Sequence, residues 1–338
     1  MTQSSDAIVP LGAMRFNSDS QKLEYWNGSA WFQIHTFSPN LDGGGRALFA
    51  GGNPAPATTT VDYITISTQG NAIDFGDTSQ SRAGQTGAAS NVTGVASGGT
   101  KGVSPYYVTN IDFYTIASTG NATDFGDSTD GRTFSGGCSN QTRACFGGGG
   151  SPSGKENIID FVTIASTGNA IDFGDIANQT DNMGGSGSNP VRGIFSGGYT
   201  PTFLDVIEFI SIPTTGNAQD FGNLTAANIR AVGMSNSIRT VMGGGQNPSS
   251  TKDIEFITTS TLGNSTMFGE LSTATTLPMN GNPASPVRGI FAGGYAPSDT
   301  ATIEYIAFAT QGDAVDFGDL TDARGAGAAM ANSHGGLG

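Results

Sequence analysis

The chain has 338 residues, of which 36% are hydrophobic, 12% are charged and 52 are glycine, and its formal net charge is −14. This charge argues against nucleic acid and anionic membrane surfaces as partners, because both attract clustered Lys and Arg side chains. No apolar run approaches the roughly 20 residues of a membrane helix, and residues 1–10 lack the basic segment of a secretory signal. Many glycines among β-branched residues predict an all-β fold rich in turns.

Residues 1–45 precede the repeats described below and are predicted to form a small β-hairpin module. Strands are expected at residues 12–17 and 22–26, and the turn signal at residues 27–28 predicts a further strand at 31–34. The pattern resembles a short module of bacteriophage tail fibres and related virion proteins. The matching residues are Gly12, Arg15, Phe16, Asn17, Leu23, Glu24, Tyr25, Trp26, Gly28 and Trp31.

This resemblance implies that the module anchors the protein. The anchoring residues implied are Arg15, Phe16, Tyr25, Trp26 and Trp31. A unit this small buries little core by itself, so we expect it to contact the repeats, sister subunits or another virion protein. The simpler alternative is a hairpin that only caps the fold.

From residue 46 to the C-terminus, four sequence markers recur six times in a fixed order. A Phe-Gly dipeptide begins at Phe75, Phe125, Phe173, Phe221, Phe268 and Phe317. Upstream of each lie a Gly-Asn pair (Gly-Asp in the last repeat), an acid that opens an apolar stretch, and a Gly-Gly pair that ends another apolar run. Four short strands are predicted in each repeat, and four-stranded units of 40–50 residues are typical of a β-propeller.

The last repeat indicates the four strands most clearly, at residues 287–294, 302–308, 314–318 and 323–332. The last of these strands consists almost wholly of small residues, which fit the crowded axis of a propeller. Its copies are therefore predicted to be the innermost strands, at residues 87–91, 136–140, 184–189, 232–236, 278–282 and 327–332. Because no such strand precedes the first repeat, we expect the C-terminal strand to complete the first blade and to remove a free sheet edge.

The repeats resemble the kelch family. Its pattern is matched by residues 290–295, by Glu304-Tyr305, by residues 317–320 and by Arg324, and a second good copy contains Glu208 and Arg230. The usual kelch Trp is Phe in every repeat, which indicates a divergent subfamily. The resemblance implies that residues 46–338 form a six-bladed β-propeller with four-stranded blades, closed by the C-terminal strand.

Candidate groups for chemistry are few. The histidines, His35 and His334, lie at no metal-ligand spacing, and no glycine-rich stretch opens a helix as a P-loop does. Paired acids such as Asp74 and Asp77 recur in the repeats and could form Ca²⁺ sites or a glycosidase pair. Their recurrence favours turns in which Asp and Asn side chains bond to nearby backbone N–H groups. We therefore predict no catalytic residue, no metal site and no cofactor.

The loops after the Gly-Gly pairs vary in length and content, whereas the Thr-Gly-Asn turns are nearly constant. Alternate loops of a four-stranded blade share one face, so a variable face should lie opposite a uniform one. Variation of this kind favours recognition on the variable face. Its aromatic candidates, which suit sugar stacking and protein contacts, are Tyr106, Tyr107, Tyr199, Phe203 and Tyr295.

Together these features predict a non-enzymatic bacteriophage virion protein, a tail or capsid-associated fibre or knob that is assembled in the bacterial cytoplasm. The module would anchor it, and the propeller would present a surface for host binding or assembly. The expected partners are other virion proteins and a host-surface glycan or protein, and homo-oligomers are compatible with this. The alternatives are a carbohydrate- or protein-binding bacterial propeller and, less favoured, a glycan-cleaving enzyme.

Overall fold

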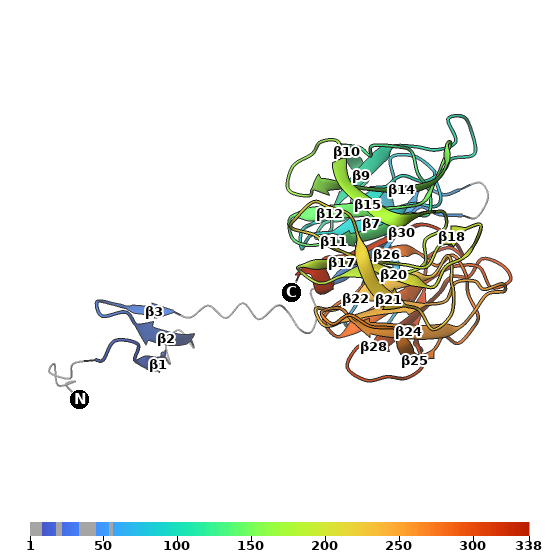
Figure 1. The fold of residues 1–338 in the computed structure, drawn as a ribbon. Coiled ribbons are helices and arrows are strands. Elements are labelled where there is room, and N and C mark those ends of the chain that lie inside the picture. The colour runs from blue at the N-terminus through green and yellow to red at the C-terminus, as the bar shows by residue number, and fades with distance from the viewer. Residues whose placement is uncertain (1–8, 18–21, 34–44, 54–56, 338) are drawn as a thin grey trace. The chain divides into compact units, whose positions relative to one another are not determined.

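The computed structural model describes residues 9–17, 22–33, 45–53 and 57–337, so His35 and part of the first variable loop lie outside the described residues. The chain divides into two compact units, Met1–Leu41 and Asp42–Gly338. In the described residues both units are built from β-strands, with one short 3-10 helix, η1 (Gly335–Leu337), near the C-terminus (Figure 1). The predicted all-β class is confirmed.

The small unit is a three-stranded antiparallel sheet in the order β1-β2-β3. Its strands are β1 (Met14–Asn17), β2 (Lys22–Trp26) and β3 (Trp31–Gln33). Asn27 forms the turn between β2 and β3, because its side-chain oxygen accepts hydrogen bonds from the backbone N–H groups of Ser29 and Ala30, at 2.9 and 2.8 Å. The three predicted strands are confirmed.

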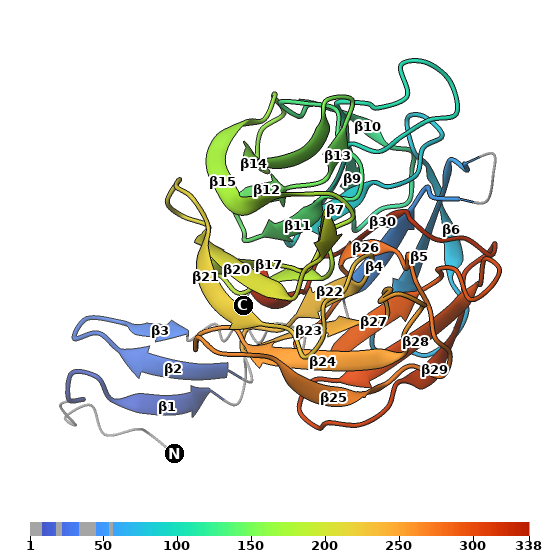
Figure 2. The same cartoon turned by 45° about the vertical axis from the view of Figure 1, so that its right-hand side comes forward.

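The large unit contains six main sheets, one for each Phe-Gly dipeptide, and a separate two-stranded hairpin (Figure 2). In five of the six main sheets the strand order begins at a small-residue strand, and sequential strands pair antiparallel. Sheet 1 contains β30 (Ala328–Ala331), β4 (Arg46–Ala50), β5 (Thr60–Thr65) and β6 (Ile73–Asp77). Sheet 2 contains β7 (Thr86–Ala89), β8 (Thr93–Ser97), β9 (Asn110–Thr115) and β10 (Thr123–Asp127). Sheet 3 contains β11 (Gly136–Ser139), β12 (Arg143–Gly147), β14 (Gly154–Thr163) and β15 (Ile171–Thr180), with the short β13 (Gly150–Ser151) beside β14.

The remaining sheets follow the same order. Sheet 4 contains β16 (Ser186–Ser188), β17 (Arg192–Ser196), β20 (Val206–Ser211) and β21 (Gln219–Asn223), and a small hairpin joins β18 (Tyr199–Thr200) to β19 (Thr202–Phe203). Sheet 5 contains β22 (Val232–Ser235), β23 (Arg239–Gly243), β24 (Asp253–Thr258) and β25 (Thr266–Glu270). Sheet 6 contains β27 (Arg288–Ala292), β28 (Thr302–Ala307) and β29 (Val315–Asp319). β26 (Asn280–Asn282) pairs in parallel with β30 of sheet 1, and the residues that flank β26, Met279 and Pro283, form backbone hydrogen bonds with β27. Several of the sheets are four-stranded and antiparallel, which is consistent with propeller-like blades.

Except for the partly buried Asn280, the residues of the small-residue strands are buried, and these strands contact one another in the order β30, β7, β11, β16, β22, β26 and again β30. The space between them is tight: a Cβ atom on Gly137 would lie 2.6 Å from the carbonyl oxygen of Gly87 in the neighbouring sheet. Residues with larger side chains would force these strands apart. Strands are thus present at the six positions predicted for the small-residue strands, and these strands lie next to one another.

The C-terminal strand β30 pairs with β4, the first strand of the large unit, from Ala328 opposite Ala50 to Ala331 opposite Ala47. In Figure 2 the red β30 lies between β26 and the blue β4. The two ends of the large unit are therefore held in one sheet.

The Gly-Asn turn of each sheet binds to the outer strand of the preceding sheet. Gly120 N donates to Phe75 O at 2.8 Å, and the side-chain oxygen of Asn121 accepts a bond from Asp77 N at 3.0 Å. Equivalent bonds occur between all neighbouring sheets, and those of Gly70 and Asn71 reach Phe317 and Asp319 of sheet 6. These bonds explain why Gly-Asn pairs recur once in each repeat.

The glycine of the Phe-Gly dipeptide lies under the next Gly-Asn turn. Gly76 has φ of 146°, and a Cβ atom there would lie 2.6 Å from the carbonyl carbon of Gly120. The preceding Phe75 packs edge-to-face on Tyr63, with ring centroids 5.9 Å apart. Phe-Gly therefore combines a core aromatic ring with a close approach between sheets.

We expect Gly76→Ala to lower the free energy of unfolding by about 1–3 kcal/mol more than Gly70→Ala, because backbone atoms must move to admit the new methyl group. Gly70 is the matched control, since it has φ of 150° but no heavy atom within 4 Å of an added Cβ atom. Urea unfolding of both variants measures the difference. Equal losses would show that backbone conformation alone requires glycine at residue 76.

Candidate binding face

The connections of the six sheets lie at two opposite ends, because the strands within each sheet are antiparallel. One end, the loop face, carries the loops after the Gly-Gly pairs and the connections from each outer strand to the next innermost strand. The other end, the turn face, carries the Gly-Asn turns and the connections from the innermost to the second strand. Residue 45, where the described part of the large unit begins, belongs to the turn face.

The five aromatic residues predicted for binding lie in loops of sheets 2, 4 and 6. Tyr106 is 61% exposed and Tyr295 is 46% exposed, whereas Tyr107 is half-buried and forms a β-bridge with Thr100. Tyr199 and Phe203 face each other across the β18–β19 hairpin, with ring centroids 5.7 Å apart. Among the described residues no ring contact joins these three loops.

The β14–β15 hairpin is longer than its counterparts, which was not predicted from the sequence. Both strands have ten residues, where the equivalent strands of the other sheets have five or six. The extension carries Lys155, whose ammonium group lies 4.0 Å from the centroid of the Tyr199 ring. A cation over an aromatic face is a favourable contact, and it joins the loops of sheets 3 and 4 into one surface.

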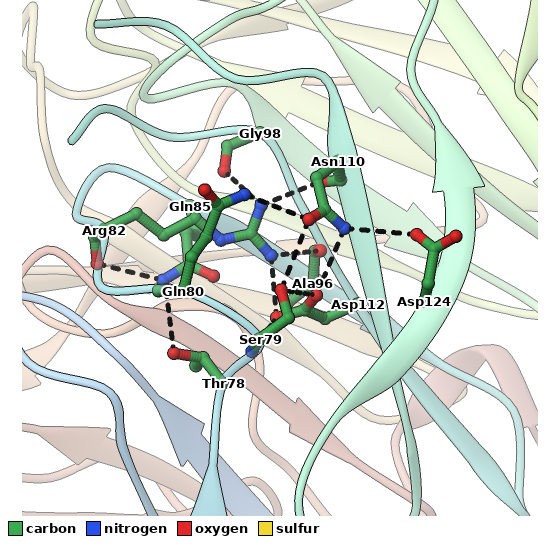
Figure 3. Close-up of polar contacts among 10 residues, drawn as sticks. All are labelled: Thr78, Ser79, Gln80, Arg82, Gln85, Ala96, Gly98, Asn110, Asp112 and Asp124. Atoms are coloured by element: carbon green, nitrogen blue, oxygen red, sulfur yellow. Dashed lines mark hydrogen bonds and ion pairs between the residues drawn. The ribbon is translucent and has the colours of Figure 1, made fainter. Parts of the chain in front are cut away.

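A buried ion pair holds sheets 1 and 2 together beneath the loop face (Figure 3). The guanidinium of Arg82 contacts Asp112 at 2.9 Å, and both side chains are fully buried. Arg82 also donates to the carbonyl oxygens of Gly98 and Asn110, at 3.0 and 2.7 Å, and more distantly to Ala96 at 3.4 Å. One side chain thus bonds to a carboxylate and three carbonyl groups of the next sheet.

The six junctions between sheets fall into two chemical classes. Arg82, Arg132 and Arg324 pair with Asp112, Asp160 and Asp62 of the following sheet. At the other three junctions the arginine is replaced and the acid is longer: Thr180, Asn228 and Thr275 lie at the arginine position, and Glu208, Glu255 and Glu304 lie at the acid position. Aspartate therefore occurs with arginine, and glutamate occurs where arginine is missing.

Every junction acid also accepts a hydrogen bond from a backbone N–H group of the preceding sheet. Ser79 N donates to Asp112 at 3.1 Å, and Ser272 N donates to Glu304 at 3.0 Å. Burial raises the pKa of Glu208, which accepts such a bond from Ala177 N. This shared bond explains why an acid recurs near the start of the second strand of each repeat.

Arg230 is not the counterpart of Arg324. It lies two residues beyond the arginine position, has φ of 56°, and its guanidinium bonds to Asn182 at 2.8 Å and not to Glu208. The assignment of Arg230 to the kelch arginine is therefore wrong, because Asn228 occupies that position.

Residues with positive φ surround the centre of the loop face. Backbone hydrogen bonds run from Phe134 N to Gly84 O, from Met183 N to Phe134 O and from Arg230 N to Met183 O. The series continues through residues 277 and 326 and returns to Gly84 N. Each connection from an outer strand to the next small-residue strand is thereby bonded to the equivalent connections of the two neighbouring sheets. These bonds restrain the backbone beneath the variable loops.

The paired acids lie on the outer strands, where Asp124 and Asp127 are exposed. The carboxylates of Asp77 and Asp127 accept hydrogen bonds from the Thr59 and Thr109 hydroxyls, at 2.8 and 2.7 Å. The side chain that accepts a bond from a backbone N–H group is instead the Asn of the next sheet: Asp77 N donates to Asn121 and Asp127 N donates to Asn169. In the described ranges no group of three His, Cys, Asp or Glu residues is placed to hold a metal ion.

His334 fills the centre of the turn face and is buried. Its Nε2 donates to Ala89 O at 2.8 Å and lies 3.2 Å from Ser139 Oγ, while its Nδ1 accepts a bond from Gly336 N at 3.1 Å. Burial lowers the pKa of His334 to about 4. The ring is therefore neutral at pH 7 and both of its nitrogens are used.

We expect stability to fall as pH decreases from about 6.5 to 4. The unfolded chain binds a proton at His334 over this range and the folded chain does not, so this residue contributes a loss of up to about 3 kcal/mol. Unfolding in urea at pH 7 and pH 4.5, for wild type and His334→Gln, measures the contribution. The same pH dependence in both proteins would contradict it.

The predicted anchoring residues lie on two faces of the small sheet. Arg15 pairs with Glu24 at 2.9 Å and lies over the Trp31 ring, which in turn contacts Trp26. Phe16 and Tyr25 belong to the opposite face and are 66% and 40% exposed. Met14 and Phe32, which were not among the predicted residues, complete this exposed apolar face.

No helix among the described residues is long and apolar enough to span a membrane. Comparison with protein-family models and with curated proteins found no match for this chain.

Proposed function

We propose that the large unit is a six-bladed, kelch-like β-propeller whose ring is closed by the C-terminal strand β30. Three observations support this proposal. β30 pairs with β4, the small-residue strands contact one another in an order that returns to β30, and the bonds of the Gly-Asn turns lead from sheet 6 back to sheet 1. Each would be expected of a closed ring.

We also propose that the protein is a non-enzymatic bacteriophage virion component whose loop face binds the host surface or another virion protein. The observation that carries this proposal is the exposed apolar face of the small unit, formed by Met14, Phe16, Tyr25 and Phe32. Contiguous exposed apolar side chains mark an interaction surface. The resemblance of this unit to fibre modules indicates an anchoring role, and the aromatic loops of the large unit supply a second surface for recognition.

Two other functions use the same surfaces. A bacterial carbohydrate- or protein-binding propeller would use the loop face for binding without being part of a virus particle. A glycan-cleaving enzyme would need two carboxylates at one site, but exposed acid pairs recur along the outer strands, which favours a structural role for them.

The test is whether fluorescently labelled protein binds whole candidate host bacteria, using the full chain and residues 46–338 side by side. We expect both to bind, because the loop face belongs to the large unit. Binding by the full chain alone would assign recognition to the small unit. If neither protein binds, the host-binding form of the proposal fails and a role in particle assembly remains to be tested with purified virion proteins.

A further inference from the structure

A pocket opens on the loop face at the junction between sheets 5 and 6. It has a volume of about 130 Å³, and its lining includes Thr275, Phe291, Gly293, Thr302 and Glu304. This is space for several water molecules. Thr275 lies at the position of the junction arginine, so the pocket lies where other junctions hold a guanidinium group.

The pocket keeps the hydrogen-bond acceptors of that guanidinium. At the junction of sheets 1 and 2, Arg82 bonds to the carboxylate of Asp112 and to the carbonyl groups of Gly98, Asn110 and Ala96. In sheet 6, Glu304 is the counterpart of Asp112 and Gly293 is the counterpart of Gly98. Thr302 and Phe291 lie two residues before them, as Asn110 and Ala96 do in sheet 2. All four counterparts line the pocket.

At the junction of sheets 4 and 5 the missing arginine is replaced by other bonds. The Asn228 amide donates to Gly244 O at 2.9 Å, and Glu255 accepts a bond from the Ser265 hydroxyl. At the junction of sheets 3 and 4 the Thr180 hydroxyl contacts the Met183 sulfur at 2.9 Å, inside the core. At these two junctions the side chain at the arginine position bonds to other groups of the protein.

The junction of sheets 5 and 6 lacks such a replacement. The Thr275 hydroxyl donates within its own loop, to Thr273 O at 3.0 Å. Glu304 is only 7% exposed, and in the described part of the chain no Lys or Arg lies within ion-pair distance of it. A carboxylate buried this deeply is stabilised by a cation.

We propose that this pocket binds the guanidinium group of an arginine side chain supplied by a partner protein. The planar guanidinium presents several donors at fixed angles, which suits one carboxylate and three carbonyl groups better than the single ammonium group of lysine does. A long side chain is needed to reach the buried carboxylate from outside. Tyr295, 46% exposed and next to the lining residue Ala296, offers a contact for the rest of the partner. The net charge of −14 favours the approach of a basic segment.

The test is an NMR titration of the isotopically labelled full chain with L-argininamide, with L-lysinamide and sodium chloride as comparisons. The reporter is the Ser272 amide, which donates to Glu304 at 3.0 Å. We expect a saturable shift of this signal with argininamide and at least tenfold weaker binding of lysinamide. No saturable shift, or equal binding of the two amides, would overturn the proposal.

Two variants and one peptide make the test specific. Thr275→Arg should fill the pocket with the protein's own side chain, and Glu304→Gln should remove the negative charge of the pocket. Each change should abolish the response of the Ser272 amide to argininamide. The control Ile238→Ser, on the turn face, should leave this response unchanged. Thermal melting shows whether each variant folds. The peptide Gly-Arg-Gly should bind as argininamide does; binding of the free amide alone would overturn a protein partner. The result does not depend on whether the protein binds host cells.

Discussion

Removal of residues 323–338 is expected to abolish cooperative folding of the large unit. The deletion removes β30, which supplies the innermost strand of sheet 1 and pairs with both β4 and β26. It also removes Arg324, the buried partner of Asp62, and His334 at the centre of the turn face. The loss would expose two strand edges, and free edges promote aggregation.

Size-exclusion chromatography and thermal melting of the chain ending at residue 322 measure this effect. The matched control is a permuted chain in which residues 323–338 precede residue 46, joined by a flexible linker, because it has the same strands with a different order. We expect the permuted protein to be monodisperse and to melt cooperatively. A truncated protein that is soluble and melts cooperatively would contradict the proposed closure.

Replacement of Arg82 by Thr is expected to destabilise the protein by about 3–5 kcal/mol, because it leaves the fully buried Asp112 carboxylate without its cation. The chain itself suggests the compensating change, since glutamate occupies the acid position wherever arginine is missing. We therefore expect Arg82→Thr combined with Asp112→Glu to recover at least about 1 kcal/mol relative to Arg82→Thr alone.

Urea unfolding of the two single variants and the double variant gives this coupling. As a matched comparison, Thr275→Arg with Glu304→Asp makes the opposite exchange at the junction of sheets 5 and 6, where it should be tolerated. If the effects of Arg82→Thr and Asp112→Glu simply add, the pairing of residue types at the junctions has no energetic cause in this contact.

The sequence predicted the strands well because each repeat carries the same local signals. Small residues at 328–331 could be assigned to the crowded centre, since only small side chains fit there, and six copies removed any doubt about the period. Gly76 and Asn121 could be recognised as markers, but not as partners. Their contact joins two repeats, and no local pattern says which surfaces of neighbouring sheets touch.

The junctions were missed for a related reason. The exchange of Arg-Asp for Thr-Glu or Asn-Glu becomes visible only when the arginine position is counted from the Phe-Gly dipeptide of one sheet and compared with the acid of the next sheet. Arg230 was misassigned because it is the nearest arginine in its repeat, although it lies two positions too late. The pocket beside Glu304 results from a side chain that is missing, which a search for functional residues does not detect.

The most direct test of the proposed recognition role compares host-cell binding by three forms of the full chain. These are wild type, a loop-face variant with Tyr106→Ala, Tyr199→Ala and Tyr295→Ala, and a turn-face variant with Ile238→Ser, whose side chain is 60% exposed. We predict that the loop-face variant loses at least tenfold in bound fluorescence while the turn-face variant binds like wild type. Equal binding by all three, or an equal loss in both variants, would contradict recognition through the loop face.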